Sequence, residues 1–92
     1  MKLKEVIEKI EDFDEDSLIF MENLNDINSD ILIAHAEEND GGIKEIYGKK
    51  YFYLLEIFLI KEFIQDYLLS INHKPSIYEI TERVYNYSIN DA

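Results

Sequence analysis

The segment from Tyr51 to Ile71 constrains the fold more than any other, because fifteen of its twenty-one residues are apolar or aromatic. A narrow polar strip runs along it at helical spacing. That strip consists of Glu62, Asp66 and Ser70, with Lys61 and Gln65 beside it. A helix so nearly apolar has to be buried on most sides, so the segment is predicted to be the core helix. Charged residues limit its uncharged runs to five residues, which argues against a membrane span.

Shorter elements are predicted on the amino-terminal side of this helix. Apolar residues at 3, 6, 7 and 10 follow the spacing of an amphipathic helix that ends near Glu11 or Asp12. The apolar runs 17–21 and 31–34 are too short for helices and are bounded by Asp and Asn, so they are predicted to be antiparallel strands. Residues 39–42 read Asn-Asp-Gly-Gly and predict a turn, and residues 43–47 fit either a third edge strand or a short helical turn.

The end of the chain predicts one more helix. Pro75 breaks the preceding segment, and Ser76 with Glu79 three residues later forms a capping box. The chain is therefore expected to be α+β, with a small antiparallel sheet of two or three strands packed with three helices. The expected order is helix, two strands, an optional third strand, and two helices. Ninety-two residues suffice for one modest core, so residues 1–92 are predicted to be a single domain.

The charge of the chain is strongly negative and lies on one side of the sequence. The net charge is −11; residues 1–45 hold fourteen acids and four bases, whereas residues 46–92 hold six acids and five bases. Such a field repels phosphate backbones and anionic lipids, which disfavours direct contact with nucleic acid or a membrane. It attracts basic proteins. The alternative interpretation is that the acidity only keeps the protein soluble.

Acidic residues are densest in the stretch EDFDED, residues 11–16. These acids follow a predicted helix, where they meet the negative end of its dipole, so helix stability does not explain them. We therefore interpret them as a docking surface for a basic protein, helped by acids further along the first half. The predicted partner-binding residues are Asp12, Asp14, Glu15, Asp16, Glu22, Asp26, Asp30, Glu37, Glu38 and Asp40. Among the tyrosines, Tyr47, Tyr78 and Tyr85 are the better candidates for surface contacts.

The acidic stretch is a partial match to a calcium-binding loop. Asp12, Asp14 and Asp16 occupy its first, third and fifth positions. The sixth position is Ser17 instead of the glycine that the sharp turn needs, and the twelfth is Asn23 instead of a bidentate glutamate. No calcium site is therefore predicted.

Other chemistry is poorly supported by the sequence. His35 and Glu37 share one strand face, but the other histidine, His73, is far away in the sequence and zinc needs at least three ligands. There is no cysteine, no phosphate-binding glycine loop and a single arginine. We predict no metal, no cofactor and no catalytic residues, and hence no enzyme. The lack of cysteine and the acids in the first turns predict a cytoplasmic protein without an export signal.

The segment YFYLLEIFLIKEFIQDY, the proline-led last helix and the closing YNYSINDA resemble a family of short, acidic, functionally uncharacterised bacterial proteins. Its members carry an acidic first helix and a strand pair before a core helix similar to YFLEVFIAKE. The resemblance covers almost the whole chain and implies a similar fold without naming site residues. In general character the chain also resembles small acidic immunity proteins and antitoxins that neutralise basic nucleases.

These observations favour an inhibitor that docks onto a basic toxin or another nucleic-acid-binding enzyme. It would act by electrostatic capture followed by steric occlusion. Two alternatives remain open. One is a nucleic-acid mimic that blocks a defence nuclease, similar to an anti-CRISPR protein. The other is a structural or oligomeric module whose acidity serves only solubility. The sequence does not determine the oligomeric state.

Overall fold

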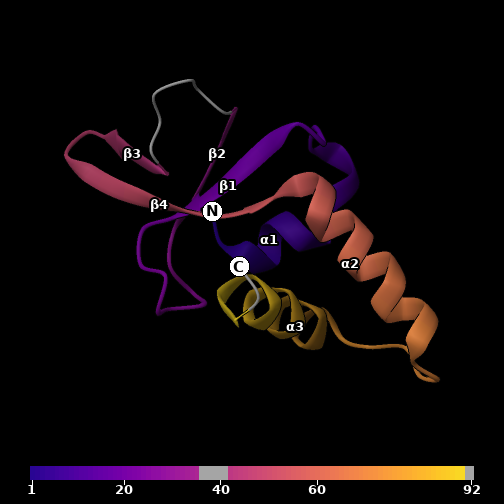
Figure 1. Ribbon diagram of the computed structural model, residues 1–92. Coiled ribbons are helices and arrows are strands. Elements are labelled where there is room, and N and C mark those ends of the chain that lie inside the picture. The colour runs from indigo at the N-terminus through magenta and orange to yellow at the C-terminus, as the bar shows by residue number, and fades with distance from the viewer. Residues whose placement is uncertain (36–41, 91–92) are drawn as a thin grey trace.

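The computed structural model describes residues 1–35 and 42–90 (Figure 1). Its strands are β1 (Ser17–Met21), β2 (Ile31–His35), β3 (Ile43–Ile46) and β4 (Lys49–Glu56). Its helices are α1 (Leu3–Glu8), α2 (Ile57–Ser70) and α3 (Ile77–Asn90), with a short 3₁₀ helix, η1 (Ile10–Asp12), after α1. The strands form an antiparallel sheet in the order β2-β1-β4-β3. The helices gather on one side of it, while the β3–β4 hairpin extends away from them (Figure 1).

The predicted fold class is confirmed, but the expected number of strands is wrong. Within the described residues the sheet has four strands instead of two or three. The pair 17–21 and 31–35 is antiparallel as predicted, with Ile19 opposite Ile33. Of the two alternatives for residues 43–47, the edge strand is correct. Of the predicted turn at residues 39–42, residues 39–41 lie outside the described part of the chain.

The predicted helix from Tyr51 to Ile71 is wrong over its first six residues. Residues 51–56 belong to β4, which pairs with β1 on one side and β3 on the other. The three aromatic residues at 51–53 favour a strand, and two rows of inter-strand hydrogen bonds outweigh the helical spacing. The spacing of apolar residues in such a short run does not distinguish a helix from a strand. The chain passes from strand to helix directly at Ile57.

An irregularity in β4 adds to the core of the protein. The pairing of β1 with β4 shifts between Ile19 and Phe20. Ile19 pairs with Leu55 and Phe20 pairs with Tyr53, which leaves Leu54 as an extra, unpaired residue of β4. An extra residue in one strand is a β-bulge, which interrupts the alternation of faces. As a result Leu54 and Leu55 are both buried in the core.

The core lies between the sheet and the three helices. Leu3 and Val6 of α1, Ile60 of α2 and Val84 of α3 are fully buried there. The apolar stripe predicted on the first helix is therefore confirmed. The capping of α3 is also confirmed in its first half, because the Glu79 N–H donates to Ser76 Oγ at 3.1 Å.

Helix α2 is less buried than its sequence predicts. Only Ile57 and Ile60 are classed as buried along it, and Phe58, Leu68 and Leu69 are exposed. The reason is architectural. Helices α1 and α3 pack against each other, and α2 contacts β1, β4 and α3, which leaves part of its surface exposed. The prediction of a helix covered on most sides is therefore wrong.

Candidate functional site

Residues 11–16, which we call the acidic turn, include the last two residues of η1 and lead into β1. All five carboxylate side chains in this turn are exposed. The Asp16 N–H donates to Asp14 Oδ1 at 3.1 Å, and the Ser17 N–H donates to the Asp14 carbonyl at 3.0 Å. These local bonds define the backbone of the turn, so that its carboxylates project from an ordered segment.

Contacts with α2 hold the acidic turn in place. Phe13, its one apolar residue, packs against the core cluster. Lys61 of α2 donates to the Phe13 carbonyl at 3.2 Å and lies 3.9 Å from Glu15 Oε1. The Lys61 side chain is mostly buried, whereas that of Glu15 is mostly exposed. Glu15 is therefore only weakly paired, and no ion pair to a described lysine or arginine involves Asp12, Asp14 or Asp16.

A second acidic group lies in the β1–β2 connection, residues 22–30. Glu22 lies 3.6 Å from Lys49 of the β3–β4 hairpin. Asp30 accepts a hydrogen bond from Lys2 at 2.8 Å. This hydrogen bond and the charge of Lys2 lower the pKa of Asp30, and the hydrogen bond to Asp30 raises the pKa of Lys2. Asp26 is exposed and accepts from the Asn28 N–H at 2.9 Å.

The predicted partner-binding residues do not form one surface in the described chain. Asp16 precedes β1 and Glu22 follows it, so the two groups lie at opposite ends of a strand, roughly 20 Å apart at the usual rise per residue. The second group is also largely paired with lysines of the chain. The predicted residues Glu37, Glu38 and Asp40 lie outside the described residues. The geometry thus leaves Asp12, Asp14, Glu15 and Asp16 as one contiguous candidate surface.

In residues 1–35 and 42–90, no group of three His, Asp or Glu side chains is placed to hold a metal ion. The second half of the calcium-like stretch is strand β1, which explains why it does not form a loop. In the same ranges, no helix combines the length and apolar character needed to cross a membrane.

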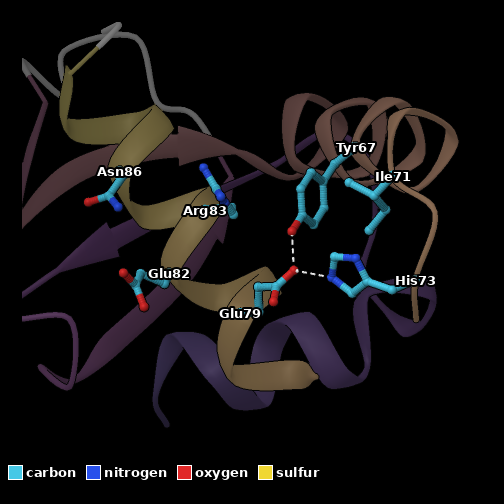
Figure 2. Close-up of a pocket in the computed structure, with 7 residues that line it drawn as sticks. All are labelled: Tyr67, Ile71, His73, Glu79, Glu82, Arg83 and Asn86. Carbon is cyan, nitrogen blue, oxygen red and sulfur yellow. Dashed lines mark hydrogen bonds and ion pairs between the residues drawn. The ribbon is translucent and has the colours of Figure 1, made fainter. Parts of the chain in front are cut away.

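A polar cluster between α2 and α3 was not predicted from the sequence. Tyr67 of α2 and His73 of the α2–α3 connection both point to the carboxylate of Glu79, at the start of α3 (Figure 2). The Tyr67 hydroxyl donates a hydrogen bond to Glu79, and His73 Nε2 lies 3.0 Å from the same oxygen. The Arg83 guanidinium lies 5.8 Å from the centre of the Tyr67 ring. A cavity of about 370 Å³ opens beside these side chains.

The cluster fits a structural connection between the two helices. The hydrogen bonds from Tyr67 and His73 lower the pKa of Glu79, which is held as a carboxylate. The hydrogen bond to Glu79 raises the pKa of Tyr67, which keeps its proton. Through these contacts Glu79 of α3 joins the last turn of α2 to the connection between the two helices. Tyr67 and His73 lie twelve and six positions before Glu79 in the sequence. The only local pattern that singled out Glu79 was the capping box, which does not predict these contacts.

Comparison with protein families, with curated proteins and with solved structures finds no match for this chain. The family resemblance seen in the sequence therefore stays a prediction, and the function is proposed from the surface of the protein.

Proposed function

We propose that this protein is a binding inhibitor that uses the acidic turn to dock onto a basic protein, in the manner of an immunity protein or antitoxin against a nuclease-type toxin. One observation carries the proposal. The carboxylates of Asp12, Asp14 and Asp16 are exposed on an anchored turn without lysine partners among the described residues. Unpaired carboxylates are free to meet cationic side chains of another molecule.

Capture would proceed in two stages. A field of one sign accelerates the encounter with a cationic cleft, and this acceleration falls as salt is added. After the encounter, carboxylates desolvated against Arg or Lys form charge-assisted hydrogen bonds, and the body of the protein covers the cleft. Inhibition then follows from occlusion, without a chemical step in this chain.

The test compares two variants with the same change in charge. The partner is first captured from the native cell, with washes of graded salt. In one variant, Asp14→Asn, Glu15→Gln and Asp16→Asn neutralise the acidic turn. In the other, Glu22→Gln, Asp26→Asn and Asp30→Asn neutralise the β1–β2 connection. We expect the first to lower the association rate about tenfold at low salt and the second to lower it much less.

High salt should bring the association rates of the two variants together, because screening removes the steering term. Equal rates for the two variants at low salt would contradict the proposal, because net charge alone would then explain the binding. An unchanged rate for the acidic-turn variant would contradict it as well.

A structural module that assembles through α2 is the second candidate. The observation in its favour is the exposure of Phe58 in the first turn of that helix and of Leu68 and Leu69 in its last turn. Leu68 and Leu69 are neighbours, and exposed apolar side chains that lie together are common at protein interfaces. A dimer that forms with rising concentration in sedimentation experiments, and that Leu69→Gln abolishes, would support this function.

A further inference from the structure

The outer side of α2 and the end of η1 enclose a groove of about 450 Å³ next to the acidic turn. Its apolar lining comes from Ile10 of η1 and from Ile64 and Leu68 of α2. Ile10 and Ile64 are partly buried against the core, whereas Leu68 is 46% exposed. The groove therefore presents apolar surface at the edge of the molecule that carries the unpaired acids.

The exposed charges at the rim of the groove are negative. Glu11 and Glu15 form its rim on the side of the acidic turn, and both are exposed. Lys61 also lines it, but its side chain is mostly buried and its ammonium group is directed to the Phe13 carbonyl. An occupant of this groove would meet an apolar floor and an acidic rim.

We infer that the groove is the docking site for the apolar face of a basic amphipathic helix of the partner protein. The inference rests on the proposed function and adds to it the chemistry of the segment that binds. Apolar residues at one-turn spacing would contact Ile10, Ile64 and Leu68, and lysines or arginines on the flanks would pair with Glu11, Glu15 and the other carboxylates of the acidic turn. The acidic turn raises the association rate, and burial of apolar surface in the groove lowers the dissociation rate.

The experiment uses the full chain and two synthetic peptides of the same composition. In one, leucines recur at helical spacing among lysines; in the other, the same residues are scrambled so that no apolar face forms. Calorimetry should show that the protein binds the amphipathic peptide about tenfold tighter than the scrambled one. Leu68→Gln should remove this preference while leaving the weak binding of the scrambled peptide unchanged.

Leu69→Gln is the matched control, because Leu69 is 80% exposed and lies outside the groove lining. It should keep the preference, and thermal unfolding should show that both variants fold. Equal affinity for the two peptides, or an equal loss in the two variants, would overturn the inference. Dimerisation that Leu68→Gln abolishes would also overturn it, because a second copy of the chain would then be the occupant.

The two proposals fail in different ways. In one outcome, neutralising Asp14, Glu15 and Asp16 lowers the affinity for both peptides equally while the amphipathic and scrambled peptides bind alike. In that case the acidic turn binds and the groove does not. If that neutralisation changes neither peptide's affinity nor its salt dependence, the proposed function fails and the groove can still be judged from Leu68→Gln. Methyl chemical shifts of Ile64 and Leu68 should move on addition of the amphipathic peptide only.

Discussion

The acidic turn and the β1–β2 connection both carry acids at an end of β1 but make different contacts. The acidic turn has five acids in six residues, and the connection has three acids in nine residues. In the connection, Asp30 and Glu22 meet Lys2 and Lys49. In the acidic turn, only Glu15 approaches a described lysine, at 3.9 Å. The difference teaches that the placement of lysines, and not the density of acids, decides which carboxylates are available to another molecule.

The connection is also held by bonds that do not involve charge. The Asn23 N–H donates to Ser29 Oγ at 2.8 Å, and the Tyr85 hydroxyl of α3 donates to the Leu24 carbonyl at 2.5 Å. The Ile31 N–H donates to the Met1 carbonyl at 2.8 Å, which joins the start of the chain to β2. The connection thus contributes to the fold. Substitutions at Ser29, Tyr85 and Asp30 test that contribution, and the first is compared with a matched change in the acidic turn.

The largest effect is expected for Ser29→Ala. Ser29 is buried, and its removal leaves the Asn23 N–H without its partner, so the free energy of unfolding should fall by about 1 to 3 kcal/mol. Asp14→Ala removes the corresponding bond in the exposed acidic turn and should change it by less than about 0.5 kcal/mol. Urea unfolding of both variants measures the difference. Equal losses would show that the two segments contribute alike to stability.

A smaller effect is expected for Tyr85→Phe. The substitution keeps the ring in the core and deletes the hydroxyl that reaches Leu24, which should cost about 1 kcal/mol of unfolding free energy. Tyr47→Phe is the control, because Tyr47 lies fully exposed at the tip of the β3–β4 hairpin. Denaturant titration should detect no loss in the control. If Tyr85→Phe is equally neutral, α3 does not stabilise the connection.

The smallest effect is the pH dependence of the ion pair between Asp30 and Lys2. Because folding lowers the pKa of Asp30, its contribution to stability is present above the ordinary carboxyl pKa of about 4 and is lost as the pH falls through and below that value. Asp30→Asn should therefore destabilise the protein near neutral pH, and the deficit should shrink in acid. Thermal unfolding over a pH series measures this deficit.

Lys2→Gln removes the other half of the same pair and should give a deficit with the same dependence on acid. A constant deficit for Asp30→Asn at every pH would contradict the assigned pair. The experiment sharpens the comparison, since it identifies an acid of the connection that serves the fold.

Local patterns in the sequence predicted several parts of this structure well. Residues 17–21 form β1 with the predicted bounds, and Ser76 caps α3 as its spacing to Glu79 predicted. The stripe on α1 is buried as its periodicity indicated. Each of these features depends on contacts within a few residues or on the alternation of one element. Such local signals do not depend on the rest of the chain.

The candidate site was predictable only in part. The exposure of Asp12 to Asp16 followed from their density, but the pairing of Asp30 with Lys2 spans twenty-eight residues and has no local signal. The cluster at Glu79 and the groove at Leu68 likewise join elements whose relative placement no periodicity gives. Sequence reasoning therefore found the charged residues and could not say which of them were neutralised within the chain.

By itself the sequence determined the α+β class, the first strand pair, the capped last helix and the one-sided negative charge, because periodicity, capping and composition are local or summed properties. Only the tertiary structure decided that residues 51–56 join the sheet and that α2 keeps an exposed face. It also separated the paired acids from the unpaired ones. The physical reason is that strand pairing and ion pairing are contacts between distant segments, whose energies depend on where the whole chain places them.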